Sequence, residues 1–275
     1  MTLAEALALA AARGLARIDA QVLLLHAIGR TGSDRAWLIA HDNDSLSPAE
    51  VEAYETLCRR RADDEPVAYL TGTREFHGMP LEVDARVLDP RADTEVLVDW
   101  SLEVLQGCAR PRVVDLGTGS GAIALAIALQ RPDAQVDAVD RSADALAVAA
   151  ANAARLGLAI RTRLGDWLRG DAGRYDLIVS NPPYIAEGDP HLPALRHEPE
   201  GALVAGPDGL DAIREIVRQA PGHLAPGGWL LIEHGHDQAA AVRALLDGAG
   251  LRRTSSRRDL AGIERCSGAQ APGLG

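Results

Sequence analysis

The chain contains few cysteines, no lysine and no long apolar run. Its three cysteines are widely spaced, and none lies in a CxxC pattern or near histidines at ligand spacing, so the sequence predicts neither a metal site nor a disulfide framework. This usage is typical of a reduced, cytoplasmic setting. All 28 basic residues are arginine. We attribute this to a codon bias towards G and C, and it carries no mechanistic meaning.

The chain also lacks a membrane-length segment and a basic net charge. The longest wholly apolar run, residues 122–129, is far shorter than a membrane span. The first ten residues contain Glu5 but no basic residue, which argues against a secretory signal. The net charge of −11 argues against affinity that comes from neutralising phosphates. We therefore expect no membrane association, no direct nucleic-acid substrate and a basic protein partner.

The stretch Asp-Leu-Ile-Val-Ser-Asn-Pro-Pro-Tyr at residues 176–184 is the most informative one. Its aliphatic residues have the composition of a buried parallel strand, which the proline pair ends abruptly. Ligands bind at the carboxyl ends of strands in an open α/β sheet, so we expect Asn181 to lie beside a substrate. Pro182 and Pro183 stiffen the chain there, and Tyr184 supplies a flat wall. Taken alone, a proline pair more often marks a simple turn.

A glycine-rich loop lies upstream of this stretch, at residues 112–121. Two valines predict a strand, the G-x-G-x-G pattern predicts a loop that lets backbone approach a ligand, and residues 122–130 predict a helix. Such a turn is typical of a nucleotide site, although NAD enzymes use a similar one. The loop residues that we expect to contact a cofactor are Gly117, Thr118, Gly119, Ser120 and Gly121.

An acidic residue ends the next predicted strand. Residues 135–140 finish at Asp140, 19 residues after Gly121, a spacing at which a carboxylate can accept both hydroxyls of a ribose. Taken alone, Asp140 has a simpler explanation as an acid at a helix N-terminus next to Ser142. Loop, helix, strand and acid together favour an adenosine cofactor.

These motifs resemble the class I S-adenosylmethionine-dependent methyltransferases that act on planar amide or amino nitrogens. The resemblance implies an α/β fold with a Rossmann-like, seven-stranded domain, and S-adenosyl-L-methionine as cofactor. Two branches share Asn-Pro-Pro-Tyr: N6-adenine DNA methyltransferases, and glutamine methyltransferases that modify translation proteins.

Further stretches resemble the peptide chain release factor N5-glutamine methyltransferases, the PrmC/HemK family. They are residues 65–76, 88–95, 197–210, 233–238 and 259–265. Three residues, His77, Asp89 and Ala92, depart from the usual pattern of that family. The resemblance spans nearly the whole chain, and the departures concern the cofactor entrance rather than the fold.

Three parts are expected along the chain. They are a small N-terminal helical substrate-docking domain at residues 1–70, a linking β-hairpin at 71–92 and the methyltransferase domain at 93–275. Apolar residues at helical spacing and the capping box at Ser47–Glu50 predict the helices. Apolar residues at alternate positions predict a second hairpin strand that runs to Leu88. The Gly-, Ala- and Pro-rich tail after Ser267 is predicted to be disordered.

Chemistry and resemblance together imply roles for the site residues. The side-chain oxygen of Asn181 and the main-chain carbonyl of Pro182 would each accept one N–H of a substrate amide, on which Tyr184 stacks. Asp166 would accept from the adenine amino group while Trp167 covers the ring, although a core tryptophan beside a surface acid explains this pair equally well. The expected cofactor residues are the five loop residues with Asp140, Asp166, Trp167 and Asn181. The expected substrate residues are Asn181, Pro182, Pro183, Tyr184 and Glu198.

The leading hypothesis is a methyl transfer from S-adenosylmethionine to the amide nitrogen (N5) of the glutamine in the Gly-Gly-Gln loop of release factors. The resemblance carries it, because the residues themselves indicate only methyl transfer to a planar nitrogen. A ribosomal protein glutamine methyltransferase is the nearest alternative, and Glu-His-Gly at 233–235 leans against it. An adenine methyltransferase of nucleic acids is disfavoured by the acidic charge. A non-enzymatic cofactor-binding module is the third class.

Overall fold

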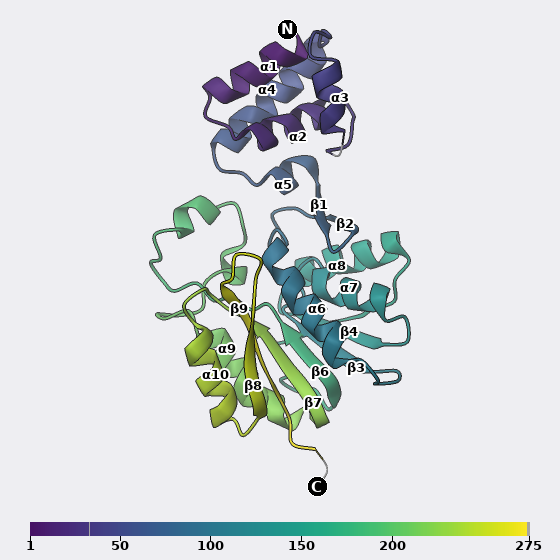
Figure 1. The fold of residues 1–275 in the computed structure, drawn as a ribbon, viewed down its shortest axis with the longest axis vertical. Helices are drawn as coiled ribbons and strands as arrows, with labels where there is room; N and C mark the ends of the chain where they lie inside the picture. Colours follow the sequence, from purple (N-terminus) through teal and green to yellow (C-terminus); the bar gives the residue numbers. More distant parts are fainter. Residues whose placement is uncertain (33, 274–275) are drawn as a thin grey trace. The chain divides into compact units, whose positions relative to one another are not determined.

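The computed structural model describes residues 1–32 and 34–273, and the chain forms two compact units, residues 1–73 and 74–275 (Figure 1). Each unit has its own cluster of buried apolar side chains. No helix in the described ranges is long and apolar enough to cross a membrane.

The first unit consists, in its described residues, of short helices around one core. Two of them begin with capping boxes, Thr2 with Glu5 and Ser47 with Glu50, the second of which the sequence predicted. Tyr54 is fully buried in the core, and its hydroxyl donates to a backbone carbonyl of another helix. The helices are α1 (Leu3–Ala12), α2 (Arg17–Ala27), α3 (Arg35–Ala40), α4 (Pro48–Ala62) and α5 (Val67–Thr71).

The second unit contains a two-stranded hairpin and a seven-stranded sheet with helices. The hairpin strands are β1 (Thr73–Phe76) and β2 (Met79–Glu82). The sheet strands are β3 (Arg112–Leu116), β4 (Gln135–Asp140), β5 (Arg161–Leu164), β6 (Tyr175–Ser180), β7 (Leu224–Glu233), β8 (Arg252–Arg258) and β9 (Glu264–Gln270). The α-helices are α6 (Glu95–Val104), α7 (Ala122–Gln130), α8 (Ala143–Leu156), α9 (Asp211–Gln219) and α10 (Ala239–Gly248). The 3-10 helices are η1 (Ala92–Thr94), η2 (Leu192–Leu195), η3 (Glu200–Ala202) and η4 (Ala220–Gly222).

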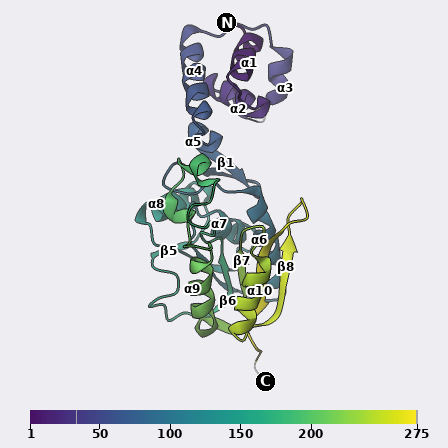
Figure 2. The ribbon, with the colours of Figure 1, turned by 90° about the vertical axis from the view of Figure 1, so that its left-hand side faces the viewer.

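The sheet has the strand order β5-β4-β3-β6-β7-β9-β8. Its pairs are parallel except for those of β9, which is antiparallel to both of its neighbours. Helices α6, α7 and α8 cover one face and α9 and α10 the other (Figure 1), and β8 forms an edge (Figure 2). The predicted Rossmann-like, seven-stranded α/β architecture is confirmed.

The strand register brings the predicted motifs to one edge of the sheet. Leu116, the last residue of β3, pairs with Val139 of β4 and with Ser180 of β6. Because the three strands are parallel, their chains leave the sheet at the same edge. Asp140 follows Val139, and Asn181 follows Ser180. The glycine-rich loop, which follows Leu116, therefore starts between Asp140 and Asn181.

The hairpin is shorter than predicted, because β2 ends at Glu82 and not at Leu88. Asp84 provides the reason: its Oδ1 accepts the backbone N–H of Arg86 at 3.0 Å, and its carboxylate pairs with the guanidinium of the same residue. This side-chain bond stabilises a turn in place of a strand. Of the alternating apolar residues, Leu81, Val83 and Val87 are nevertheless buried, whereas Ala85 is exposed. Most of the pattern therefore reflects burial, although these residues do not continue the strand.

The prediction of a disordered tail after Ser267 is wrong for residues 268–270, which complete β9 between β7 and β8, and its last two positions, 274 and 275, lie outside the described residues. A Cβ at Gly268 would collide with the side chain of Leu231 and lie 2.9 Å from the carbonyl oxygen of Leu230. The small residues of this segment therefore allow close packing inside the sheet.

Candidate active site

A cavity lies where β3, β4 and β6 end. It brings together most of the residues predicted to contact the cofactor. Its lining includes Gly117, Thr118, Gly119, Ser120, Asp140, Asp166, Trp167, Asn181 and Pro183. Gly121 lies outside this lining: it has φ +84°, and a Cβ there would lie 3.1 Å from Leu125 and 3.2 Å from Ala149. This glycine lets α7 and α8 approach each other.

Asp140 holds the glycine-rich loop in place. Its Oδ2 accepts the N–H of Gly119 and its Oδ1 accepts the N–H of Ser142, both at 2.9 Å. Each carboxylate oxygen can accept a further hydrogen bond. Asp140 is therefore the acid beside a helix N-terminus and also an available acceptor at the cavity wall, so the two interpretations of its position are compatible.

Trp167 and Asp166 form another part of the wall. A Cβ at Gly117 would meet the Trp167 ring at 3.4 Å, so the ring lies directly against the loop. Trp167 itself has φ +55°. The side-chain oxygen of Gln219 accepts the backbone N–H of the next residue, Leu168, at 2.9 Å. Asp166 is half exposed and pairs with Arg169 at 3.2 Å.

Asp115 is a site residue that the sequence analysis missed. It is fully buried under the loop, where its Oδ2 accepts the Thr118 hydroxyl at 2.7 Å and the Ala124 N–H at 3.2 Å, while its Oδ1 has no partner among the described residues. Burial raises its pKa to about 7. The sequence did contain a signal for this role: Asp115 lies at a buried strand position inside the glycine-loop motif.

Asp115→Asn is expected to remove a pH dependence of stability. Because its pKa in the folded state, about 7, lies above the ordinary 3.8, Asp115 contributes stability below pH 4 that is lost as the pH rises to about 7. The loss is on the order of 4 kcal/mol. Urea denaturation from pH 4 to 8 should show the free energy of unfolding of the variant gaining on the wild type by this amount. A difference that does not change with pH would mean that Asp115 is ionised in the folded protein.

A second cavity adjoins the first. Its lining contains Asn181, Pro182 and Tyr184 together with apolar residues of the loop between β6 and α9, such as Leu195 and Leu203. Asn181 lines both cavities, whereas Pro183 lines only the first. The Asn-Pro-Pro-Tyr stretch thus forms the wall between the two spaces.

Asn181 is oriented by Thr94, which the sequence analysis also missed. The Asn181 side-chain N–H donates to the hydroxyl oxygen of Thr94 at 3.1 Å. Its side-chain oxygen accepts no hydrogen bond from the described residues and is left as an acceptor. Thr94 is buried and ends η1, so nothing in its local sequence marked it as a partner of residue 181.

Tyr184 is oriented by a buried acid, Glu233, at the end of β7. The Tyr184 hydroxyl donates to Oε1 of Glu233 at 3.4 Å. Burial raises the pKa of both groups, that of Glu233 to about 7. An acid that ends a buried strand at the functional edge was a signal for such a role.

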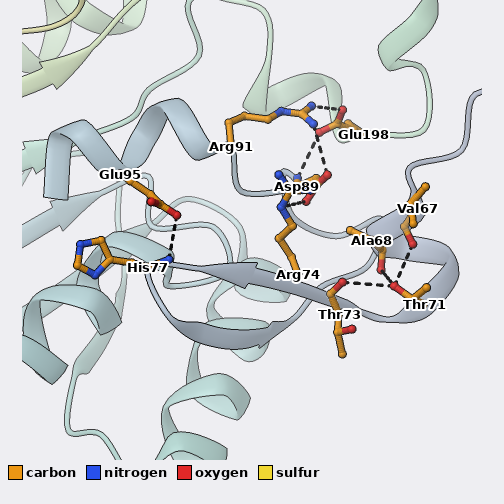
Figure 3. Close-up of polar contacts among 10 residues, drawn as sticks. All are labelled: Val67, Ala68, Thr71, Thr73, Arg74, His77, Asp89, Arg91, Glu95 and Glu198. Atoms are coloured by element: carbon orange, nitrogen blue, oxygen red, sulfur yellow. Dashed lines mark hydrogen bonds and ion pairs between the residues drawn. The ribbon is translucent and has the colours of Figure 1, made fainter. Parts of the chain in front are cut away.

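Glu198 lies outside the lining of both cavities, in an ionic cluster of two buried acids and two partly exposed arginines (Figure 3). Its carboxylate accepts from the Arg91 guanidinium at 2.5 Å and from the Asp89 N–H at 3.2 Å. Arg91 also pairs with Asp89 at 3.4 Å, and Arg74 does so at 3.5 Å. Burial raises the pKa of Asp89. The cluster ties the loop that carries Glu198 to the segment before η1, next to the second cavity.

The chain is similar to known families and proteins. Residues 93–197 match the family described as Methyltransferase small domain, and residues 3–72 match the PrmC N-terminal domain. A release factor glutamine methyltransferase of Bordetella pertussis is 56% identical over 259 residues, which cover 93% of this chain and 95% of that protein. One of Xylella fastidiosa is 50% identical over 273 residues and 98% of both chains.

Solved structures show the same fold. The T. thermophilus 16S rRNA N2 G1207 methyltransferase, in complex with AdoMet and guanosine, superposes with a TM-score of 0.54 and 20% identity over 72% of this chain and 49% of that one. The α/β sheet is thus that of a class I methyltransferase. The two relatives are 56% and 50% identical in sequence over nearly all of both chains, which shows the family as well as the fold. The chain therefore belongs to the release factor glutamine methyltransferase family.

Proposed function

We propose that this protein transfers a methyl group from S-adenosyl-L-methionine to the side-chain amide nitrogen (N5) of the glutamine in the Gly-Gly-Gln loop of peptide chain release factors. One observation carries the proposal: Asn181 lines both the cavity of the glycine-rich loop and the cavity of Pro182 and Tyr184. A methyl donor in the first cavity and a substrate amide in the second would meet at this residue. The names of the relatives support the release factor as substrate, and we propose that the reaction takes place in the cytoplasm.

The first cavity fits the cofactor by the chemistry of its donors and acceptors. Asp140 has free acceptor capacity for ribose hydroxyls, Asp166 is an acceptor for an adenine amino group, and the Trp167 ring offers a flat apolar surface. A side chain at position 117 would fill the space beside that ring. When bound, S-adenosylmethionine supplies an electrophilic methyl group on a sulfonium.

The second cavity fits a primary carboxamide. The nitrogen of an amide is a poor nucleophile because its lone pair is delocalised into the carbonyl. The Asn181 side-chain oxygen and the Pro182 main-chain carbonyl would each accept one N–H, which orients the nitrogen and lets electron density build on it. The Tyr184 ring provides a wall for the planar group. Holding the partners in line is worth on the order of 7–11 kcal/mol, and water suffices to take the proton from the methylated nitrogen.

Mass spectrometry of a release factor incubated with this protein and S-adenosylmethionine tests the proposal. We expect a gain of one methyl on the glutamine of the Gly-Gly-Gln loop and no gain in a variant with alanine at that position. A ribosomal protein and a duplex DNA serve as competing substrates. Methylation of either one, with an unmodified release factor, would overturn the proposed substrate.

A further inference from the structure

Arg91 gives the second cavity a cationic wall. Of the described residues that line this cavity, only Arg91 has a charged side chain, and the others are apolar apart from Asn181 and Tyr184. The Tyr184 hydroxyl donates to Glu233, which lies outside the lining. The Arg91 side chain is 37% exposed, so it is open to a ligand. The cavity therefore combines apolar walls with one strong hydrogen-bond donor.

Two buried acids hold the guanidinium of Arg91 in place (Figure 3). Its Nη2 donates to Glu198 at 2.5 Å and its Nη1 donates to Asp89 at 3.4 Å. The side chains of these acids are only 2% and 6% exposed. A guanidinium carries five N–H groups, and these two bonds use one on each Nη atom. The acids thus fix the group at the cavity wall and leave it with donors for a ligand.

The charges of the ionic cluster cancel. Arg74 pairs with Asp89 at 3.5 Å, so the cluster contains two arginines and two acids and has no formal net charge. An arginine that already faces two carboxylates attracts a further anion weakly, yet its free N–H groups still form directed hydrogen bonds. Arg91 is therefore suited to a neutral acceptor such as a carbonyl oxygen.

The carboxamide placed in the second cavity needs such a donor. A primary carboxamide has two N–H groups and one carbonyl oxygen. The Asn181 side-chain oxygen and the Pro182 main-chain carbonyl would accept the two N–H groups, which leaves the oxygen of the same planar group to be satisfied. A polar atom that loses water and gains no partner weakens binding. Arg91 lines the same cavity as Asn181 and Pro182 and supplies the donor.

We propose that Arg91 binds the side-chain carbonyl oxygen of the substrate glutamine, and that the second cavity thereby selects a carboxamide over a carboxylate. This inference rests on the proposed function and deepens it, because it names a residue that determines specificity. A carboxylate would place an oxygen against the two acceptors, and the neutralised Arg91 would not offset that repulsion. Glu198 touches no substrate in this arrangement and is a positioning residue that acts through Arg91.

Arg91→Gln is expected to raise KM for a Gly-Gly-Gln peptide about 10- to 100-fold and to change kcat by less than about threefold. A donor to the carbonyl oxygen draws the nitrogen lone pair further into the carbonyl. Its contribution is therefore to binding and orientation and not to nucleophilicity. Steady-state kinetics with saturating S-adenosylmethionine would separate the two constants.

Arg74→Gln is the matched control. Arg74 belongs to the same cluster and pairs with the same Asp89, but it lies outside the lining of both cavities. Both substitutions change the charge of the cluster by the same amount, and only Arg91→Gln should raise KM. An equal rise in the two variants, or a loss of kcat at unchanged KM in Arg91→Gln, would overturn the inference. If Arg91→Gln does not fold, Arg91→Lys keeps a charge beside Glu198 and should still raise KM about tenfold, since lysine lacks the planar fork.

Peptide binding gives a readout independent of activity. Fluorescence anisotropy with S-adenosylhomocysteine, which has no methyl group to give, would compare labelled Gly-Gly-Gln and Gly-Gly-Glu peptides. The wild type should bind the glutamine peptide at least about tenfold more tightly. Asp89→Asn removes one negative charge beside Arg91 and should narrow this difference. Equal affinity of the wild type for both peptides would contradict the inference.

The two proposals fail in different ways. A wild type that binds the glutamine peptide through Arg91 but methylates no glutamine would refute the proposed function and leave the carboxamide site standing. A wild type that methylates the release factor, with Arg91→Gln indistinguishable from it in KM and in peptide affinity, would refute the role of Arg91 alone.

Discussion

Asn181→Ala is expected to lower kcat for release factor methylation by about 10²- to 10³-fold, because it removes an acceptor placed where charge develops in the transition state. The structure sharpens this expectation. The Asn181 side-chain N–H is held by Thr94, so the free oxygen is the atom that the variant loses. Single-turnover kinetics with saturating cofactor would measure the effect on chemistry, and calorimetry would measure cofactor binding, which should change little.

A matched control is available in Asn43, an exposed asparagine of the first unit whose side chain donates to Asp42. Asn43→Ala should leave kcat at the wild-type value. Asn181 also lines the cofactor cavity, so the opposite outcome is informative. An Asn181→Ala enzyme with normal kcat and weakened cofactor affinity would show that Asn181 is a cofactor ligand and that its proposed substrate role is wrong.

Removing residues 1–70 is expected to raise KM for a full-length release factor about 10²-fold or more while cofactor affinity stays close to that of the full chain. Both cavities are lined by residues of the second unit, which has its own core. A glutamine side chain buries far less than the 1,200–2,000 Å² or so of a specific protein interface. We therefore propose that the helical unit supplies a second contact, which raises the effective concentration of the substrate loop.

The control for this deletion is a short peptide that contains Gly-Gly-Gln. The peptide is too small to reach a second contact, so the full and the truncated enzyme should methylate it with the same kcat/KM. Steady-state kinetics with both substrates would separate docking from catalysis. Equal losses on the peptide and on the protein would point to damage in the catalytic unit and count against a docking role.

Much of the fold and of the first cavity could be predicted from the sequence because the signals are local. A buried strand, a glycine-rich turn and an acid at the end of the next strand lie within residues 112–140, and right-handed parallel pairing places their ends together. Predictions from local sequence failed where one sequence pattern is compatible with two different structures. Alternating apolar residues did not distinguish a strand from a buried turn after Glu82, and small residues after Ser267 did not distinguish a disordered tail from a tightly packed strand.

The sequence by itself determined the strand ends, the loop and the Asn-Pro-Pro-Tyr wall, because each depends on neighbours a few residues apart. Only the tertiary structure decided what holds that wall: Thr94 is 87 positions from Asn181, and Glu233 is 49 positions from Tyr184. It also assigned Glu198 to a cluster with Asp89 and Arg91 rather than to the cavity lining. The physical reason is that hydrogen-bond direction and burial depend on the order of strands in the sheet, which brings β3, β6 and β7 side by side.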